Sequence, residues 1–504
     1  MPTTLPVLDH AFVTAYDAGT PQVVWTRLVA DLETPVSAML KLADGRPYSF
    51  LLDSVEGGAV RGRYSIIGLK PDVLWRARSG QAEINRSVRH DPTAFVADGP
   101  ALDSLRRLVE ESRIDLPAGL PPMAAMVAGY LGYDVVRLVE PQIADTNPDP
   151  IDVPDGIFLR PTLMAIFDNV EHMVTLVTPV RREDGVSAAA AYTLAQERLA
   201  DAVTDFQRTL PYRREAFDTL STPPAPMGTM APATYCEMVK KAKEYILAGD
   251  IFQVVLSQRF TVPFRLPPFS LYRSLRRTNP SPFMFYLDMG AFHIVGASPE
   301  ILVRLRDGQV TIRPIAGTRK RGATPDEDKT LAADLLADPK ELAEHLMLLD
   351  LGRNDVGRVA KVGTVSVRAD EKMFVEYYSH VMHIVSNVTG EIAPGHDALD
   401  ALFAGFPAGT VSGAPKVRAM EIIDELEPVR RGFYAGTVGY FAANGSMDTC
   451  ISLRTCLVKD GVMHVQAGAG IVADSDPMAE YEECLNKAKA LVRAAEEAVR
   501  YAAG

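Results

Sequence analysis

Residues 338–355, D-P-K-E-L-A-E-H-L-M-L-L-D-L-G-R-N-D, indicate how the rest of the chain is organised. Asp338 suits a helix N-cap, and Pro339 suits the first helical position. Glu341 stands at the third position, from which its side chain can reach back to the cap. The pattern predicts a helix that continues to about Leu351. On that helix Glu341 and Glu344 lie three residues apart and therefore share one edge.

A second stretch near the end of the chain, S-D-P-M-A-E-Y-E-E-C-L-N-K-A-K, has the same design. Asp476 and Pro477 suit the cap and the first turn, Glu480 and Glu483 lie three residues apart, and Lys487 follows one turn later. If the two helices face each other, unit charges about 5 Å apart repel by roughly 3 kcal/mol at an effective dielectric near 20. A hard divalent cation, Mg2+ first, would offset that repulsion, whereas a lone glutamate pair is more often a solvated helix side.

The composition excludes several classes of function. The chain has 504 residues, of which 47% are hydrophobic, and a net charge of −12. This is enough for two or three domains or one unusually large one. The negative charge and the lack of a basic run disfavour nucleic-acid binding. The chain start does not resemble a signal peptide, and no apolar window is long enough to span a membrane, so we expect a soluble cytoplasmic protein. The thiols lack CxxC spacing and are expected to be reduced: Cys236, Cys450, Cys456 and Cys484.

The stretch T-L-S-T-P-P-A-P-M-G-T-M-A-P predicts a linker at 219–232, which divides the chain into an N-terminal region, 1–218, and a second region, 233–504. Thr234 with Glu237 predicts a capping box at the start of the second region. Strand candidates follow one another there without a regular βαβ period. This favours an α+β fold with large, mostly antiparallel sheets packed with helices.

Two expectations concern individual strands of the second region. In I-F-Q-V-V-L-S-Q-R-F-T-V, alternation places Gln253 and Ser257 on one side and Phe252 and Val254 on the other. Residues 446–457 are expected to form a single strand.

Long motifs in the chain match one enzyme family. They are G-D-I-F-Q-V-V-L-S-Q-R, N-P-S-P-F-M-F-Y, G-A-S-P-E, P-I-A-G-T-R, A-E-H-L-M-L-L-D-L-G-R-N-D, F-P-A-G-T-V-S-G-A-P-K and G-A-G-I-V. With L-L-D-S near the start and E-Y-E-E-C-L-N-K-A near the end, they span nearly the whole chain. The chain resembles the chorismate-utilising enzymes, and among them most closely the large subunits of anthranilate synthase. The resemblance implies the fold of that family, with a chorismate-binding catalytic domain at 233–504.

The resemblance implies a magnesium site and a substrate site. In such enzymes Mg2+ holds the ring carboxylate of chorismate and stabilises the electron density that builds there. Glu344 and Glu483 match direct ligands of the ion, and Glu341 and Glu480 match residues that assist through water. The positions that match substrate contacts are Gly317, Thr318, Tyr434, Arg454, Gly468, Ala469 and Gly470.

Catalytic roles also follow from the resemblance. Glu300 matches the acid that protonates the departing C4 hydroxyl, and His383 matches a histidine assigned to pyruvate elimination. His380 is the alternative histidine, and a lone histidine in an apolar strand is more often a core residue. Thr410 matches a ring contact. Lys487 matches a residue that offsets the glutamate charge and touches the substrate.

Two positions indicate the nucleophile. Relatives that add water carry a lysine base where this chain has Gln253, and glutamine cannot act as that base. Aminodeoxychorismate synthases carry a lysine nucleophile where this chain has Ala316, and alanine offers none. The resemblance therefore implies amination of chorismate at C2, loss of the C4 hydroxyl, and elimination of pyruvate to give anthranilate. Aminodeoxychorismate synthesis is the alternative within the family.

A partner and an effector are implied as well. No glutamine amidotransferase domain fits in the chain, so the resemblance implies a partner subunit of that kind, which supplies ammonia in a hetero-oligomer. It also implies feedback inhibition by L-tryptophan. The matching effector positions are Asp53, Ser54, Pro282, Phe283, Met284, Phe285, Tyr440 and Cys450. Asp53 stands where the family more often has glutamate. The aspartate side chain is one methylene shorter, which would lengthen one contact to the effector. A tryptophan-sensing subunit without turnover is the alternative from another class.

Overall fold

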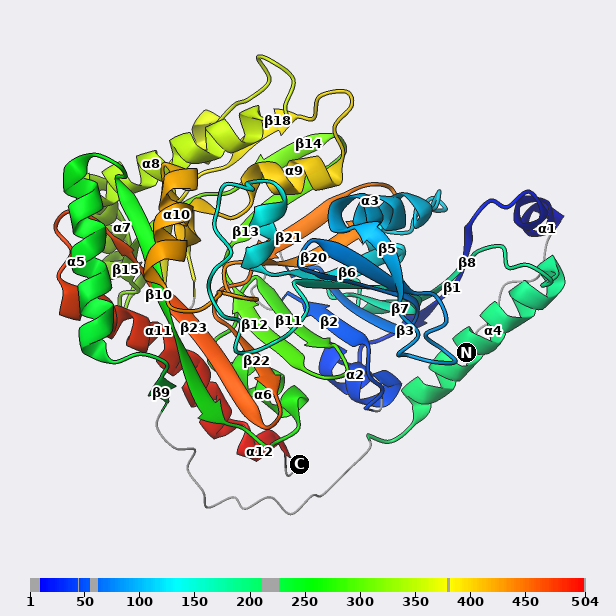
Figure 1. The fold of residues 1–504 in the computed structure, drawn as a ribbon. Helices are drawn as coiled ribbons and strands as arrows, with labels where there is room; N and C mark the ends of the chain where they lie inside the picture. Colours follow the sequence, from blue (N-terminus) through cyan, green and yellow to red (C-terminus); the bar gives the residue numbers. More distant parts are fainter. Residues whose placement is uncertain (1–9, 44, 55–61, 211–225, 379–380, 503–504) are drawn as a thin grey trace.

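The computed structural model describes residues 10–43, 45–54, 62–210, 226–378 and 381–502. Within these ranges the chain forms a 20-stranded sheet, a separate three-stranded sheet and helices around both (Figure 1). Every strand pair of these ranges is antiparallel. The predicted α+β class with mostly antiparallel sheets is confirmed.

The elements have the following bounds. In the first half the strands of the large sheet are β1 Gln22–Val29, β2 Ser49–Asp53, β3 Tyr64–Arg78, β4 Gln81–Asn85, β5 Val96–Pro100, β6 Met126–Leu131, β7 Gly156–Asp168 and β8 Met173–Val180. In the second half they are β9 Met227–Gly228, β10 Gln253–Pro263, β11 Phe283–Asp288, β12 His293–Ser298, β13 Ile301–Arg306, β14 Gln309–Ile312, β18 Val388–Glu391, β19 Gly413–Ala414, β20 Thr437–Ala442, β21 Met447–Ile451, β22 Thr455–Lys459 and β23 Val462–Ile471. The small sheet consists of β15 Ile315–Lys320, β16 Phe374–Tyr377 and β17 Val381–Val385. The helices are α1 His10–Asp17, α2 Pro35–Ala43, α3 Ala101–Glu111, α4 Ala188–Gln207, α5 Pro232–Ala248, α6 Pro268–Thr278, α7 Pro325–Ala337, α8 Pro339–Gly357, α9 Ala398–Gly405, α10 Lys416–Leu426, α11 Pro477–Glu497 and α12 Val499–Ala502.

Strands from the two halves of the chain interleave in the large sheet. One continuous path of pairings runs β10–β23–β22–β12–β11–β2–β3–β7–β6–β20–β21–β13–β14–β18. The N-terminal strands β2, β3, β7 and β6 therefore lie between β11 and β20 of the second half. Trp75 and Tyr235, one from each half, belong to the same buried cluster. The first part of the predicted linker, 219–225, lies outside the described residues, and its placement as a domain boundary stays a prediction.

Both glutamate helices begin as their sequences predict. Asp338 accepts hydrogen bonds from the backbone of Lys340 and Glu341 at the start of α8, and Asp476 caps α11 in the same way. The α8 helix continues to Gly357, beyond the predicted end near Leu351. Gly352, Asp355 and Val356, beyond the predicted end, are buried. The helix continues through them because tertiary packing stabilises a helix more than local propensity does.

Two local expectations were wrong, and a third holds only in part. The α5 helix starts at Pro232 with Ala231 as its N-cap, so Thr234 lies inside the first turn, because proline is favoured at the first helical position. Within β10 the predicted alternation is confirmed, because Gln253 and Val255 line a cavity whereas Val254 and Leu256 belong to a hydrophobic cluster. Phe252 departs from it, since this residue precedes the strand and is exposed. The single strand predicted at 446–457 is broken into β21 and β22.

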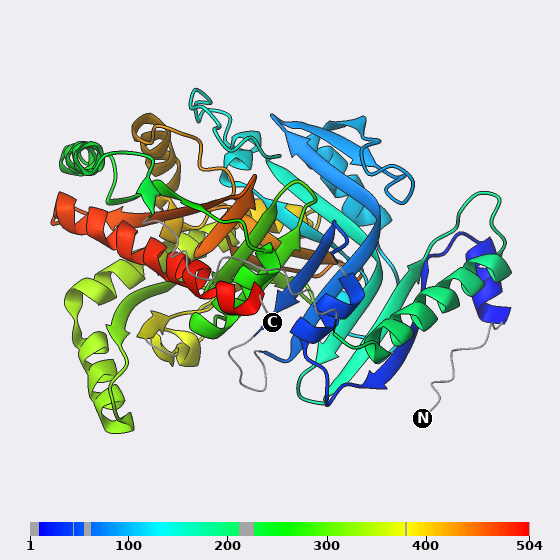
Figure 2. The same cartoon turned by 90° about the horizontal axis from the view of Figure 1, so that it is seen from below.

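Helices cover the sheet where the glutamate pairs lie. The α11 helix packs on β23 and against α5, and α8 packs on β15 of the small sheet and on β18. Figure 2 shows the red helix α11 along one side of the molecule, whereas α1 and α4 pack together at the opposite end. Over the described ranges, no helix combines the length and apolarity that a membrane crossing requires. All four cysteines, which fall within these ranges, are free thiols, as predicted.

Candidate active site

A cavity of about 1310 Å³ lies where β10, β15, β23, α8 and α11 come together. It is lined by all but one of the residues predicted to be catalytic, substrate-binding or metal-binding. These are Gln253, Glu300, Gly317, Thr318, Glu341, Glu344, His383, Thr410, Tyr434, Arg454, Gly468, Gly470, Glu480, Glu483 and Lys487. Ala469 is the exception: its side chain is fully buried in the largest hydrophobic cluster and does not line the cavity, because neighbouring residues of a strand point to opposite faces.

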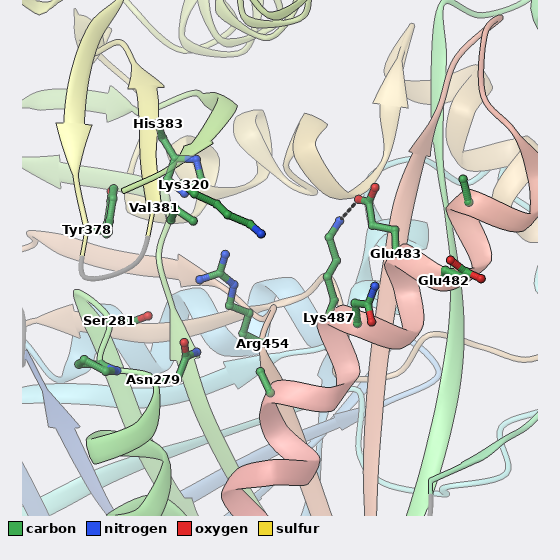
Figure 3. Close-up of a pocket in the computed structure, with 14 residues that line it drawn as sticks. Asn279, Ser281, Lys320, Tyr378, Val381, His383, Arg454, Glu482, Glu483 and Lys487 are labelled. Atoms are coloured by element: carbon green, nitrogen blue, oxygen red, sulfur yellow. Dashed lines mark ion pairs between the residues drawn. The ribbon is translucent and has the colours of Figure 1, made fainter. Parts of the chain in front are cut away.

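The cavity opens into a neighbouring hollow of about 720 Å³ (Figure 3). His383, Arg454, Glu483 and Lys487 line both spaces. In Figure 3 the side chains of Lys320, Arg454 and Lys487 point from three different elements into this hollow. Glu482 and Glu483 line the same hollow, so its charged side chains leave a small positive excess, which suits an anionic substrate.

Glu300 is a buried carboxylic acid at the cavity wall. It lies in the turn between β12 and β13, where only 7% of the residue is exposed. Burial raises the pKa of Glu300 to about 8, although the hydroxyl of Thr410 and the charge of Arg454 act in the opposite direction. Thr410 Oγ1 donates to Glu300 Oε1 over 3.3 Å. At neutral pH the Glu300 carboxyl therefore holds a proton that it can donate.

His383 lies on β17 of the small sheet, opposite Thr318 of β15. Its Nδ1 is 3.2 Å from the carbonyl oxygen of Gly317 and 3.0 Å from Thr318 Oγ1. Burial, followed by the charge of Arg454, lowers the pKa of His383 to about 4, so the ring is neutral at pH 7. Gly317 has a φ of +77° at a register shift of β15, a conformation that glycine adopts without strain. The alternative histidine, His380, lies outside the described residues.

Gln253 starts β10 and is 6% exposed. Its Oε1 is buried and has no hydrogen-bond partner among the described residues. Gly470 provides the space for this amide, because a Cβ at Gly470 would lie 2.3 Å from Gln253 Nε2. A buried acceptor without a partner costs free energy, and it is available to a donor that enters the cavity.

Arg454 lies in the break between β21 and β22, with a φ of 49°. The break is what places its guanidinium near both Glu300 and His383, whose pKa values it lowers. Tyr434 is buried nearby, and burial raises its pKa. The guanidinium of Arg431 lies 5.6 Å from the Tyr434 ring centroid, a cation–π contact that supports the ring from behind.

Comparisons with known proteins identify the family of this site. A model of the family described as chorismate binding enzyme matches residues 56–493. The chain belongs to the chorismate-binding enzymes. It is 60% identical over 494 residues to anthranilate synthase component 1 of Cereibacter sphaeroides, covering 98% of each chain. Its structure is similar to that of anthranilate synthase component I from Streptococcus pneumoniae, with a TM-score of 0.75, 37% identity, and coverage of 92% of this chain and 99% of that one. The menaquinone-specific isochorismate synthase of Escherichia coli, 21% identical with a TM-score of 0.70 and 95% coverage of both chains, shares the fold.

The four glutamates of this family member line the cavity, two from α8 and two from α11. Burial, followed by the charges of Glu341 and Glu483, raises the pKa of Glu344. Burial and the charge of Glu483 raise the pKa of Glu480. Within the described ranges, no three histidine, cysteine or carboxylate side chains converge on one point. The donors fit Mg2+ nevertheless, because this ion takes one or two carboxylates and keeps several waters.

Two of these glutamates also contact the chain itself. Glu341 Oε2 accepts from the backbone N–H of Thr318 over 3.2 Å, which links α8 to the substrate wall on β15. It does not reach back to the cap of α8 as its sequence position allows, because its other oxygen accepts from Arg319 over 3.1 Å. Lys487 Nζ lies 2.7 Å from Glu483 and 2.9 Å from the carbonyl oxygen of Gly468. Lys487 therefore joins the charged edge of α11 to the glycine strand β23.

The predicted effector residues lie away from this cavity, around the pairing of β2 with β11. Phe283, Phe285, Tyr440 and Cys450 belong to one hydrophobic cluster, whereas Met284 packs on the opposite face. Pro282 is buried just before β11, and Ser54, half-buried, follows β2. None of them lines the active-site cavity.

Asp53 has partners within the protein. Its carboxylate accepts from Ser65 Oγ over 2.6 Å, Tyr272 OH over 2.9 Å and Arg276 Nε over 2.7 Å. It is opposite Met284 in the β2–β11 register. The buried Asp53 carboxylate thus joins β2 to β3 and to α6.

Several cavity residues were missed from the sequence. Lys340 lines the cavity one position before Glu341, and Lys320 lines the hollow of Figure 3, two positions after Thr318. Strand alternation places Lys320 on the same side as Thr318, so this signal was present in the sequence. Gln466 also lines the cavity, but it lies outside every motif that we compared.

Proposed function

We propose that this chain is the chorismate-aminating subunit that converts chorismate and ammonia to anthranilate and pyruvate. The observation that carries the proposal is Gln253, a buried amide with an unpartnered Oε1 that lines the same cavity as Glu300 and His383. An amide is not basic enough to activate water, but its oxygen accepts a hydrogen bond from ammonia, which is itself the nucleophile. The similarity to anthranilate synthase component 1 supports the same reaction.

Arg454 and Tyr434 are the groups that bind the enolpyruvyl carboxylate of chorismate in this proposal. A planar guanidinium suits a carboxylate because it can donate two parallel hydrogen bonds. Gly468 and Gly470 leave the backbone of β23 accessible on the cavity side. Thr318 and Gly317 form the opposite wall on β15, where the ring lies.

Proton transfers are divided between two side chains. Glu300, protonated at neutral pH, donates to the departing C4 hydroxyl while ammonia adds at C2. His383 then acts in the elimination of pyruvate. A carbonyl oxygen only accepts, so the contact with Gly317 places the proton on Nδ1 and leaves Nε2 as a base. Thr410 holds the Glu300 carboxyl in position through its hydroxyl.

In the proposed site Glu344 and Glu483 would hold Mg2+ directly, and Glu341 and Glu480 would hold its water ligands. When bound, the ion supplies positive charge for the ring carboxylate of chorismate. Lys487 offsets part of the glutamate charge on α11, since it lies 2.7 Å from Glu483.

We further propose that ammonia comes from a glutamine amidotransferase partner subunit, in a cytoplasmic hetero-oligomer, and that L-tryptophan inhibits the enzyme. The name component 1 of the relatives supports a second component. The strand β11 connects the two sites, which supports a route for inhibition. Asn279 and Ser281, just before β11, line the hollow of the active site. Phe285, on β11, lies in the cluster of predicted effector residues.

The test measures anthranilate fluorescence from the purified chain with chorismate, an ammonium salt at alkaline pH and Mg2+. EDTA should abolish the product, and L-tryptophan should suppress it. Isochorismate or aminodeoxychorismate as the product would contradict our interpretation of Gln253 and Ala316. Folded protein that binds tryptophan but turns over no chorismate would support the sensing subunit instead.

A further inference from the structure

A second cavity, of about 520 Å³, lies in the N-terminal half of the chain between the end of α2, the start of β2, β3 and α4. Four cationic side chains line it: Arg46, Lys70, Arg89 and Arg198. They come from four separate segments, and no aspartate or glutamate is among the lining residues. The cavity shares no residue with the active site or with the predicted effector set.

These four cations act on one another. Burial, followed by the charge of Arg46, lowers the pKa of Lys70, and the charge of Arg198 acts in the same direction. Burial and the charge of Arg89 lower the pKa of Arg198. Three of the six pairs, Arg46 with Lys70, Arg198 with Lys70, and Arg89 with Arg198, are thus close enough to repel. Arrangements of like charges in a cavity are costly and are typical of sites that bind the opposite charge.

No carboxylate of the described residues lines the cavity beside this group. Among the residues that the structure describes, none of the four cations forms an ion pair within 4.0 Å. Two acids that act on these cations each hold another arginine: Asp72 lies 2.8 Å from Arg160, and Asp205 lies 2.9 Å from Arg208. Asp201 and Glu183 act on Lys70 and Arg198 only at a distance. The cavity therefore keeps a net positive charge.

Most of the remaining wall is apolar. Leu42, Leu69 and Val88 line it together with Tyr48 and three prolines. The volume falls within the range of about 300–1,000 Å³ that is typical of small-molecule sites. A free inorganic ion would leave most of this wall uncovered, whereas a ligand with an apolar body would cover it.

Two residues in the wall have a backbone conformation that side chains rarely adopt. Tyr48 has a φ of 58° and Lys70 a φ of 51°. The Lys70 carbonyl accepts a hydrogen bond of 2.6 Å from the hydroxyl of Thr162, which also lines the cavity. Backbone strain of this kind concentrates at ligand sites because binding offsets its cost.

We propose that this cavity binds a small organic anion in which an apolar body carries a phosphate or carboxylate group. The site is independent of the proposed amination reaction. It also differs from the predicted effector site: Ser49 lines the cavity at the start of β2, whereas Asp53 ends that strand about 13 Å farther along.

Calorimetric titration of the full chain with phenyl phosphate, benzoate and inorganic phosphate tests the proposal. We expect one phenyl phosphate or benzoate to bind per chain at millimolar concentration, more tightly than inorganic phosphate, and more weakly as salt is added. If phenyl phosphate binds more tightly than benzoate, the natural ligand carries a phosphate group, and the reverse order of affinities indicates a carboxylate group.

The variant R46Q/R89Q removes two exposed cations, so its fold should be unchanged, and it should bind at least about tenfold more weakly. R265Q, an exposed arginine elsewhere, is the matched control and should bind as the unmodified chain does. Arg454→Gln checks the active site, which also carries positive charge, and should leave binding unchanged. Binding that survives in R46Q/R89Q, binding that is lost in Arg454→Gln, or no binding of any probe to the unmodified chain would overturn the proposal.

Discussion

The imidazole Nδ1 of His383 lies 3.2 Å from the carbonyl oxygen of Gly317. This contact favours the tautomer with the proton on Nδ1, because a carbonyl can only accept, and the Thr318 hydroxyl 3.0 Å away can accept from the same N–H. With its pKa lowered to about 4, the ring is neutral at pH 7 and presents Nε2 as a base.

Replacing His383 by asparagine should keep a donor near Gly317 and remove the base. We expect kcat for anthranilate to fall by about 10²- to 10⁴-fold, the usual contribution of a general base. The thermal midpoint should change little. His293→Asn is the control, since His293 is half-buried, also has a pKa of about 4, and does not line the cavity. A kcat within about threefold of the unmodified enzyme would exclude His383 from catalysis.

Glu300→Gln keeps an acceptor for Thr410 and removes the proton that the C4 hydroxyl needs. We expect a loss of kcat of about 10²-fold or more. In the unmodified enzyme kcat should fall as the pH rises through about 8, where Glu300 loses its proton. The assay should hold free ammonia constant, so that the pH dependence of the nucleophile does not hide this loss. A kcat that stays flat to pH 9 would argue against Glu300 as the acid.

Glu300→Gln should also change how the stability of the chain depends on pH. The folded pKa of Glu300, about 8, lies above its value in the unfolded chain, so the stability contributed by the neutral carboxyl is fully present below about pH 4.5. It is lost as the pH rises through about 8. Glutamine cannot ionise, so Glu300→Gln should raise the thermal midpoint relative to the unmodified chain at pH 8 and above but not at pH 4.5. Equal differences at both pH values would refute the raised pKa.

Gln253→Lys should change the nucleophile. A lysine amine can take a proton from water, whereas the amide cannot. We expect ammonia-dependent anthranilate to fall by about tenfold or more and isochorismate to become detectable by chromatography. Gln253→Leu is the matched variant, and it should lose anthranilate without the new product. Full anthranilate activity in both variants would show that Gln253 does not position the nucleophile.

Glu344→Gln should weaken Mg2+ binding by about tenfold or more, because it replaces a charged ligand by a neutral one. Calorimetric titration with Mg2+ measures this without turnover. Glu482→Gln is the control, since Glu482 lies on α11 beside the predicted ligand Glu483 and lines the outer hollow but is not itself a predicted ligand. If the two variants bind Mg2+ equally well, the proposed ligand set is wrong.

Asp53→Asn should destabilise the chain by about 2–4 kcal/mol, because it removes the charge that Arg276 and Tyr272 contact in a buried site. Urea unfolding measures the change. Asp103→Asn, at an exposed position on α3, should change the free energy of unfolding by less than about 0.5 kcal/mol. A loss below about 1 kcal/mol at Asp53 would mean that its contacts contribute little in solution.

Local signals in the sequence were sufficient for some features. Asp338 and Asp476 could be recognised as helix caps because capping depends on a few adjacent residues. The glutamate spacing followed from helix geometry in the same way. The antiparallel class followed from strand candidates that succeed one another without helices between them.

Long-range contacts could not be predicted in this way. Nothing near Asp53 indicates that Arg276 contacts it, because the two residues meet only when α6 packs beside β2. The break that places Arg454 could not be recognised either, since Ile451 and Thr455 on its two sides favour strand. The burial of both faces of β10 depends on strands and helices far away in the sequence.

The interleaved strand order limits how the polypeptide can be divided. A fragment that begins after residue 226 would leave β11 without β2 and β20 without β6, and each would expose a row of unpaired backbone groups that promotes aggregation. Chimeras between relatives should therefore take both strands of each pair from one parent. In this fold the catalytic half cannot be transferred to another protein by itself, because its strands pair with strands of the N-terminal half.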